Sequence, residues 1–279
     1  MLIDVDPTIV RAGPFPLTWQ GIFIALGIVA GLLVFARALR SRGVDGEVAV
    51  DAAIWILPPA FVGARLFHVM DAWNYYAVHP LDVFAIYRGG ATVYGAVIVG
   101  TFVGLLFARR RRLPLGGFFD AAASGQAFGI AVGRIGDVLT GAYIGRQTDW
   151  PIGVKYVNPA SYDQRQQFVH PVAAYEVIWD LAIFVLLTRL LVRLPSGWSF
   201  LIFTILYAFG QIVMGFLRVE APDVGTLGQA QLIGIVALGL ATIGVMLLNL
   251  RSPHGSRCQT RLRRPNPDTV VNLMTKRRQ

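Results

Sequence analysis

The chain has 279 residues, of which 55% are hydrophobic and only 15% are charged, and its mean hydropathy is +0.57. Soluble domains carry about 25% charged residues, so this composition excludes a soluble globular protein and indicates an integral membrane protein organised as one polytopic unit. The formal net charge is +9, so the placement of the basic residues is informative about orientation in a membrane.

The N-terminal residues 1–16 are polar and contain prolines, with no basic region and no small-residue cleavage site. We therefore expect no signal peptide, and the first apolar segment would act as the insertion signal. Seven apolar segments follow, and most reach the roughly 20 residues that a spanning helix needs. They cover about residues 17–36, 51–70, 91–108, 116–133, 171–192, 197–217 and 226–250. This pattern predicts an all-α polytopic membrane protein with about seven transmembrane helices.

Basic residues gather in alternate connections between these segments. The first, third and fifth connections and the C-terminal tail carry 17 of the 25 basic residues. Such residues belong on the cytoplasmic side, which predicts an N-terminus outside and a C-terminus inside. The eight remaining basic residues fall on the outer side or within spans, where each needs a structural or functional reason.

The long outer connection, about residues 134–169, is too polar for a span and contains aromatic residues that suit a membrane interface, such as Trp150 and Tyr162. It predicts a small exofacial head of short strands or irregular structure. Residues 1–250 are then a single transmembrane domain. The basic tail, 251–279, is predicted to be disordered and held near anionic lipid by charge, or to serve only as a solubilising tail.

The stretch Gly133–Arg146 stands out because it carries two arginines, one aspartate and four glycines at the end of an apolar segment. An arginine at membrane depth is costly unless it faces a polar cavity or an anionic partner. Arg134 could hold two phosphate oxygens in a bidentate contact. It could equally form an intramembrane ion pair with Asp137, which a helix would place on the same face. The residues alone leave both interpretations open.

Other chemistry has little support in the sequence. The four histidines lie in separate segments, and there is no phosphate-binding loop or dinucleotide fingerprint. We expect no metal and no cofactor. The only cysteine, Cys258, lies in the tail, which excludes a disulfide framework within one chain and means that a substrate would have to supply any reacting thiol.

The stretch around Arg134 resembles the signature of the bacterial prolipoprotein diacylglyceryl transferases, a Gly-Arg-x-Gly-Asn run that ends in Gly-Arg. Further matches occur in the family's order and together cover roughly residues 15–245. They are Leu17-Thr18-Trp19-Gln20-Gly21, Gly89-Gly90 with Tyr94-Gly95, His170-Pro171-x-x-x-Tyr175-Glu176, and Leu217-Arg218 followed by Ala230-Gln231.

The resemblance implies transfer of a diacylglyceryl group from phosphatidylglycerol to the lipobox cysteine of a prolipoprotein signal peptide. A thioether would form and glycerol phosphate would leave. The location would be the bacterial inner membrane, with no cofactor and no nucleic-acid partner. Such a reaction needs a cationic cradle for the departing phosphate, a cavity open outward and laterally to lipid, and a polar group near the sulfur.

The resemblance also suggests residue roles. Arg134, Arg146 and Arg218 would form the cradle, and Tyr94 would lie near the attacking thiol. The remaining contributions to substrate binding would come from Asp137, Gly145, His170 and Glu176.

Simpler structural roles compete with several of these assignments. Tyr94 could be an interfacial anchor, Arg146 a surface cation, and Arg218 the partner of an acidic neighbour, Glu220. Glu176 is expensive inside a span unless it is paired, so a structural ion pair is the expected role. Its candidate partners are Arg65 and Arg134.

Five positions depart from the family pattern, one of them Thr140, where the family usually has asparagine. Gln20 stands where the family has tyrosine, Ala142 where it has an acidic residue, and Gln211 where it has arginine. Asp137 stands where the family has asparagine, and a carboxylate repels phosphate whereas an amide donates to it. Tyr94 differs mildly, because some members have histidine there. These departures motivate a second hypothesis, a paralogue that binds anionic lipid or a lipoprotein precursor without catalysis. A small transporter is disfavoured because no internal repeat is visible.

Overall fold

The protein is described here by a computed structural model that covers residues 1–13, 15–85, 90, 92–143, 145–191, 193–219 and 228–251. At residues 12, 15, 93, 94, 229, 230 and 247–251 the description is limited to the backbone. The chain divides into two compact units, Met1–Val245 and Met246–Gln279. All the contacts described below lie within the first unit.

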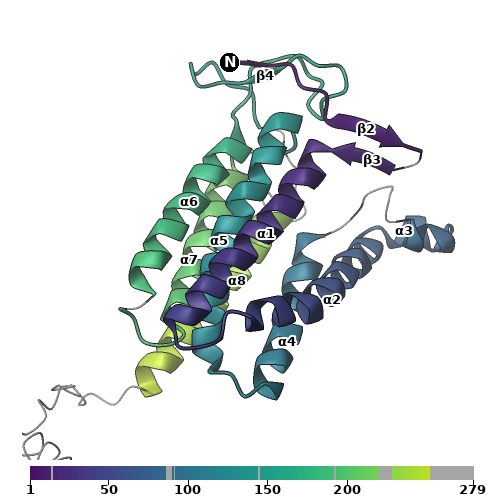
Figure 1. Ribbon diagram of the computed structural model, residues 1–279. Helices are drawn as coiled ribbons and strands as arrows, with labels where there is room; N and C mark the ends of the chain where they lie inside the picture. The colour runs from purple at the N-terminus through teal and green to yellow at the C-terminus, as the bar shows by residue number, and fades with distance from the viewer. Residues whose placement is uncertain are drawn as a thin grey trace, which may run out of the picture. The chain divides into compact units, whose positions relative to one another are not determined.

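The described part of the chain is dominated by α-helices, so the predicted all-α architecture is confirmed (Figure 1). Seven long helices coincide with the seven predicted apolar segments. They are α1 (Trp19–Ser41), α2 (Val48–Asp71), α4 (Val93–Arg110), α5 (Leu115–Thr140), α6 (Val172–Leu190), α7 (Trp198–Gly215) and α8 (Gln229–Arg251). Two short helices, α3 (Trp73–Tyr76) and the 3-10 helix η1 (Pro80–Phe84), lie between α2 and α4. By length and composition, α1, α2 and α7 are each apolar enough to cross a membrane.

Helix α5 is longer than its apolar segment predicted, and it includes Arg134, which was expected to follow the helix. The segment was expected to end near residue 133, but the helix continues to Thr140 and stops at Gly141, whose left-handed φ of 77° closes it. The Thr140 hydroxyl donates to the Gly136 carbonyl at 2.9 Å. Arg134 and Asp137 therefore lie on the last two turns of a helix and not in the head.

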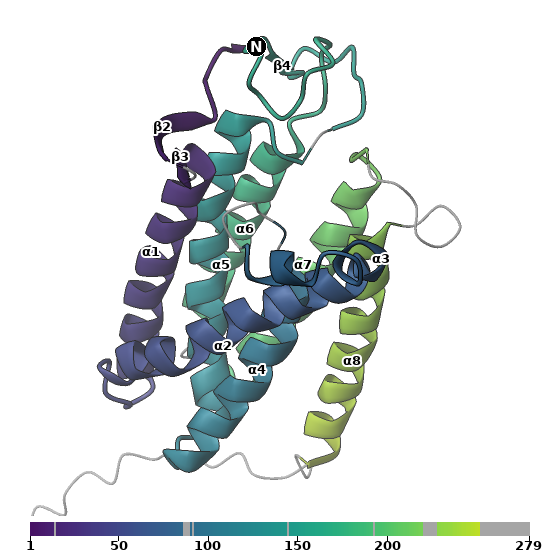
Figure 2. The same ribbon diagram turned by 90° about the vertical axis from the view of Figure 1, so that its right-hand side faces the viewer.

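Helix α5 is the centre of the bundle. It packs against α1 on one side and against α6 and α7 on the other, and both ribbon views show it between α1 and α6 (Figures 1 and 2). Its contact with α1 is made by glycines, with Gly27 and Gly31 of α1 facing Gly125 and Gly129 of α5. Small residues of this spacing let helix backbones approach closely where lipid supplies no hydrophobic driving force. Helices α2 and α4 form a second pair.

The glycine contact makes a specific prediction about stability. A Cβ atom at residue 129 would lie 2.7 Å from the Gly27 carbonyl oxygen, so Gly129→Ala must push two backbones apart. We expect it to destabilise the protein by about 1–3 kcal/mol in unfolding followed by helix content in mild detergent. The matched control is Gly239→Ala in α8, where no atom of the described residues outside its own helical turn lies within 4 Å of the added methyl. Equal stability of the two variants would contradict the close α1–α5 packing.

At the opposite end of α5, Asp120 joins three elements. Its buried carboxylate accepts hydrogen bonds from the backbone N–H groups of Gly197 (2.8 Å) and Phe200 (2.9 Å) and pairs with Arg42 at 2.9 Å. The first N–H groups of a helix have no partner within it, and α7 has no side-chain cap of its own. Asp120 therefore caps α7 from the neighbouring helix.

The segment between α5 and α6 contains little regular structure and one short strand, as the sequence predicted, but the partner of this strand was not indicated by the sequence. Strand β4 (Lys155–Tyr156) pairs in parallel with β1 (Leu2–Ile3) at the N-terminus. A second pair, β2 (Thr8–Ala12) with β3 (Phe15–Thr18), is an antiparallel hairpin that leads into α1. The small core is formed by Ile3, Val154, Tyr156 and Val169.

Tyr156 fastens this segment to the helix bundle. Its hydroxyl donates to the Val138 carbonyl of α5 at 2.9 Å. Burial, helped by the nearby carboxylates of Asp163 and Asp137, raises the pKa of Tyr156 to about 12. The phenol therefore stays protonated and keeps donating across the physiological pH range.

Candidate functional site

The end of α5 carries a buried cluster of opposite charges. Arg134 pairs through Nη1 with Oδ2 of Asp137 at 3.0 Å and through Nε with Oε2 of Glu176, on α6, at 2.9 Å. The exposed fractions of these side chains are 11%, 7% and 2% respectively. The ion pair between Arg134 and Asp137, one of the two interpretations open from sequence, is therefore present, and Glu176 completes it.

A second arginine enters the same cluster from the other side. Arg218, which follows α7, pairs through Nη2 with Oε1 of Glu176, and its side chain is 3% exposed. Gln211 of α7 bridges the two, because its amide donates to Glu176 Oε1 at 3.2 Å and accepts from Arg218 Nη2 at 3.4 Å. The sequence alternative for Arg218, a pair with Glu220, involves a residue outside the described ranges.

Three of the positions that depart from the family pattern meet at this cluster. Gln20, at the start of α1, donates to Oδ1 of Asp137 at 2.8 Å, while Gln211 bridges Arg218 and Glu176. Asp137 is thus held between an amide and a guanidinium. Ala142, another departing position, does not join the cluster and lines a small cavity beside it.

Sequence reasoning missed Tyr143. Its ring centroid lies 4.1 Å from Cζ of Arg134 and 4.5 Å from Cζ of Arg218, within the range of cation–π contacts. Its backbone is left-handed, with φ of 59°, which is unusual for a residue other than glycine. The available signal was its place between Gly141 and Gly145, in the stretch that already stood out for its charges.

Asp180 was missed as well. It lies one helical turn after Glu176 on α6 and is 2% exposed. Its Oδ2 has no hydrogen-bond partner in the part of the chain that the structure describes. The spacing of four residues from Glu176 could have indicated it, because residues four apart share a helix face.

The backbone beside the cluster is tightly held. Gly145 forms an antiparallel bridge with Arg218, and the N–H of Arg146 donates to the Leu217 carbonyl at 2.7 Å. The N–H of His170 donates to the Arg146 carbonyl at 3.0 Å. A Cβ atom at Gly145 would collide with the His170 carbonyl, so this close approach requires glycine.

The predicted cradle of three arginines is only partly assembled. Arg134 and Arg218 are buried together, whereas Arg146 is exposed. Within the described residues its side chain donates from Nε to the Arg218 carbonyl at 3.4 Å. Arg146 therefore lies at the rim of the cluster and not inside it.

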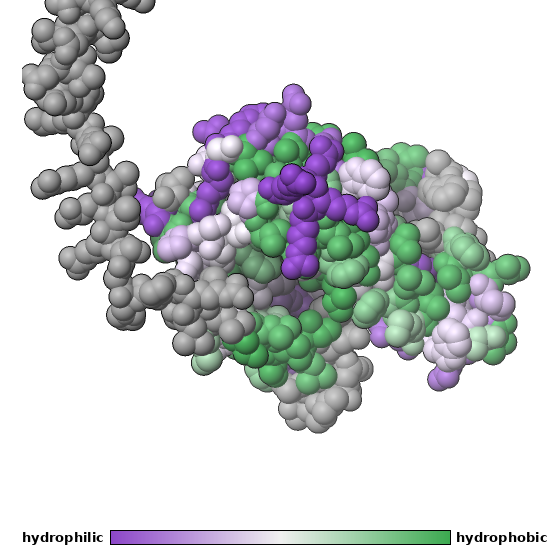
Figure 3. Space-filling view, turned by 90° about the horizontal axis from the view of Figure 1, so that it is seen from below, coloured by the Kyte–Doolittle hydropathy of each residue, from purple (hydrophilic) through white to green (hydrophobic). Residues whose placement is uncertain are grey.

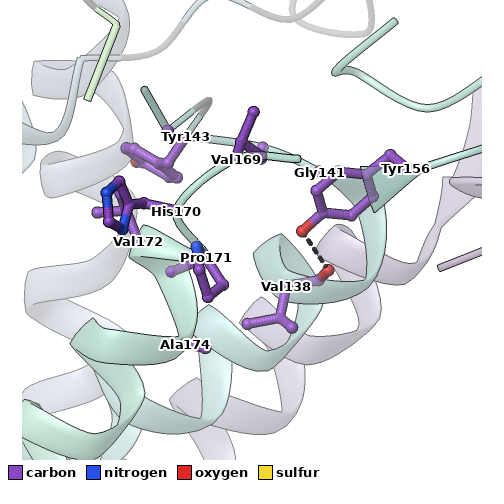
Figure 4. A pocket seen from close by; sticks show the side chains of 12 residues that line it. Val138, Gly141, Tyr143, Tyr156, Val169, His170, Pro171, Val172 and Ala174 are labelled. Atoms are coloured by element: carbon purple, nitrogen blue, oxygen red, sulfur yellow. Dashed lines mark hydrogen bonds between the residues drawn. The ribbon is translucent and has the colours of Figure 1, made fainter. Parts of the chain in front are cut away.

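His170 lies beside the cluster at the start of α6. Its Nδ1 is 3.3 Å from the Tyr175 hydroxyl, and its ring makes an edge contact with Trp150. Together with Tyr143, Gly141 and Tyr156 it lines a cavity of about 10 Å³ between the end of α5 and the start of α6 (Figure 4). That volume accommodates about one water molecule.

Two further predictions from the sequence concern Tyr94 and Arg65. Tyr94 lies in the first turn of α4, but its side chain and Gly89 are outside the described part. Arg65 is not a partner of Glu176. Its guanidinium instead donates to the carbonyls of Asp82, Val83 and Gly90 at 2.7–2.9 Å, beside a cavity of about 340 Å³. These contacts join Asp82, Val83 and Gly90 to α2.

The cluster suits recognition of an anion rather than metal binding. Within the described ranges, no group of three or more His, Cys, Asp or Glu side chains could hold a metal ion. Two guanidiniums offer forked N–H donors that match phosphate oxygens. Asp137 and Glu176 balance their charge, so an incoming anion would exchange with carboxylate contacts.

Long apolar helices around a buried arginine–carboxylate cluster define a membrane protein with a polar site inside its helix bundle. Comparison with known families identifies the family of membrane proteins to which the chain belongs. The sequence model of the prolipoprotein diacylglyceryl transferases matches residues 7–248. The chain belongs to this family.

Individual relatives agree with this assignment. A protein of Synechococcus elongatus is 34% identical over 250 residues, which are 86% of each chain. A protein of Dehalococcoides mccartyi is 35% identical over 242 residues, 86% of this chain and 92% of the relative. A protein of Trichormus variabilis is 31% identical over 277 residues, 95% of this chain and 93% of the relative. Each is named phosphatidylglycerol–prolipoprotein diacylglyceryl transferase.

Proposed function

We propose that the protein transfers the diacylglyceryl group of phosphatidylglycerol to the lipobox cysteine thiol of a prolipoprotein signal peptide, in the bacterial inner membrane. The family and the named activity of its relatives support this reaction. The structural observation that carries it is the pair of buried guanidiniums, Arg134 and Arg218, joined through Glu176.

The reaction forms a bond between the cysteine sulfur and a glycerol carbon and breaks the bond from that carbon to the phosphate oxygen. Negative charge develops on the departing glycerol phosphate, and the proton of the thiol passes to that phosphate or to water. Guanidiniums fixed beside that charge lower the barrier because they need little reorganisation during the reaction. Arg134 and Arg218 serve this purpose, while the exposed Arg146 attracts the headgroup at the rim.

The other candidate residues support these groups. Asp137 and Glu176 hold the guanidiniums in a charge-balanced arrangement before the substrate binds. The phosphate then replaces these carboxylates as the acceptor of the guanidinium N–H groups. Gly145 allows the backbone to pass close to His170, which completes the wall of the site. Tyr94 is the polar group that we assign near the sulfur.

The positions of the helices and of the basic residues support the membrane arrangement that we propose. The seven long helices span the membrane with the N-terminus outside and the C-terminus inside, and residues 1–250 form one transmembrane domain with a basic tail at 251–279. The arginines of the first and third connections support this orientation, because Arg37, Arg40 and Arg109–Arg112 are exposed. Hydrophilic side chains gather on the face seen from below in Figure 3. The segment between α5 and α6 is then the exofacial head.

Asp137→Asn tests the charge balance of the site. The substitution removes a carboxylate that competes for Arg134 and keeps an oxygen that can accept from Gln20. We expect KM for phosphatidylglycerol to fall about three- to tenfold, equivalent to roughly 1 kcal/mol. The control is Asp51→Asn, which removes an exposed partner of Arg111 and should leave KM unchanged. An unchanged or higher KM in Asp137→Asn would show that this carboxylate does not oppose the phosphate.

A complementation assay tests the proposed function itself. The protein is expressed in a bacterium depleted of its own diacylglyceryl transferase, and a model prolipoprotein is examined by mass spectrometry. The expected result is addition of the diacylglyceryl group to the lipobox cysteine. Unmodified substrate, with the protein folded in the membrane, would instead indicate binding of anionic lipid or precursor without catalysis.

A further inference from the structure

Arg134 and Arg218 carry like charges and come from elements far apart in the sequence, yet both guanidiniums meet the same two groups. One is the carboxylate of Glu176, which pairs with each arginine. The other is the ring of Tyr143, whose centroid is 4.1 Å from one guanidinium carbon and 4.5 Å from the other. Two bridges, one ionic and one aromatic, therefore hold the guanidiniums side by side.

The backbone at Tyr143 shows that this ring is held in place by its surroundings. A left-handed conformation at a residue with a side chain persists only where neighbouring contacts determine it. Such contacts lie on both sides. Gly141 closes α5, and Arg146 is bonded through its N–H to Leu217 and through its carbonyl to His170. Arg165 adds a hydrogen bond to the Gly145 carbonyl at 2.8 Å.

An aromatic ring differs from a carboxylate in its effect on the charge of the site. Asp137 and Glu176 pair with the two arginines, and Asp180 is buried one helical turn after Glu176, so a further carboxylate in place of the ring would make the site more negative and oppose any anion. The π-face of Tyr143 attracts both cations without adding charge. It orients the guanidiniums while leaving their positive charge available to a phosphate.

We propose that Tyr143 is a positioning residue that keeps Arg134 and Arg218 together as a single receptor for the phosphate of an anionic lipid. This proposal rests on the proposed function, because phosphatidylglycerol is the lipid tested. The ring, not the hydroxyl, carries the effect. The two guanidiniums are already adjacent before the lipid arrives, and the loss of this arrangement weakens binding of substrate and transition state alike.

Kinetic measurements on three variants test this role. Tyr143→Phe keeps the ring and should have a KM for phosphatidylglycerol within about twofold of wild type, whereas Tyr143→Leu should raise KM about tenfold. The value of kcat should change less than about threefold, because a uniform loss of binding raises KM alone. The control is Tyr162→Leu, which changes an exposed tyrosine of the head and should leave both constants unchanged.

An independent readout does not depend on catalysis. In 15N-arginine NMR spectra of the protein in nanodiscs, the ring should shift the Hε signals of Arg134 and Arg218. Each signal is assigned by its loss in the corresponding lysine variant. The shifts should persist in Tyr143→Phe and disappear in Tyr143→Leu.

The two measurements separate the possible failures. If wild type has no transferase activity but the arginine signals behave as expected, the proposed function fails and the contact of the ring with both arginines stands. The positioning role is overturned if Tyr143→Phe behaves like Tyr143→Leu, or if Tyr143→Leu lowers kcat without raising KM. Arginine signals that are unchanged in Tyr143→Leu would overturn the positioning role as well.

Discussion

Arg134→Lys should lower kcat/KM for phosphatidylglycerol by at least about a hundredfold while the protein still inserts and folds. The substitution keeps the positive charge but replaces a rigid fork with a single flexible ammonium. In the structure, Arg134 contacts Asp137 through Nη1 and Glu176 through Nε. The single ammonium of a lysine cannot make both contacts in these directions. Loss of one fixed donor to a developing oxyanion costs roughly 100- to 1,000-fold in other enzymes.

The matched control for that experiment is Arg111→Lys. Arg111 pairs with Asp51 at 2.8 Å, but both side chains are about half exposed, and exposed pairs of this kind contribute little. Arg134→Ala extends the test and should abolish activity, with membrane insertion checked separately. Full activity in Arg134→Lys would rule out a bidentate role for this guanidinium in headgroup recognition.

Glu176→Leu should destabilise the protein by about 3–5 kcal/mol, because it leaves two buried guanidiniums without their shared carboxylate. Glu176 is 2% exposed and pairs with both Arg134 and Arg218. Desolvated cations without a partner are far more costly than a buried pair. The measurement is the free energy of unfolding in mild detergent, or the yield of folded protein where the variant does not accumulate.

A double variant makes this prediction specific. In Glu176→Leu with Arg218→Leu, one of the two guanidiniums that lost the Glu176 carboxylate is also removed, so part of the lost stability should return. Glu47→Leu serves as a control because Glu47 is exposed and makes no side-chain cap at the start of α2. If Glu176→Leu lowers the free energy of unfolding by less than about 1 kcal/mol, then groups other than Glu176 compensate the charges of the two arginines.

The helices were predictable because hydropathy and length determine which segments form them. The residues at which the helices end were harder to predict. Helix α5 passes through Arg134 and Asp137 because their charges are paired within the bundle, and an apolar-segment pattern contains no information about such pairing. The participation of Leu2 and Ile3 in a strand with Lys155 and Tyr156 is a long-range contact that no local pattern indicates.

The members of the charged cluster could be picked from the sequence, but their arrangement could not. Arg134, Glu176 and Arg218 were all expected to contribute, yet their meeting depends on how α5, α6 and the end of α7 pack. Arg146 is in the same motif as Arg134 but lies outside the cluster, because the chain turns at Gly141. Tyr143 was missed because its contacts with the two arginines depend on a left-handed backbone that only the folded chain reveals.

The measurement that tests the central claim most directly is reconstitution of the purified protein in vesicles with a lipobox peptide. Product is followed as diacylglyceryl-modified peptide and as released glycerol phosphate, in vesicles of phosphatidylglycerol and in vesicles of phosphatidylethanolamine. We predict that both products form in equal amounts with phosphatidylglycerol only, and that Arg134→Lys removes them together. Folded wild-type protein that releases no glycerol phosphate and leaves the peptide unmodified would contradict the account.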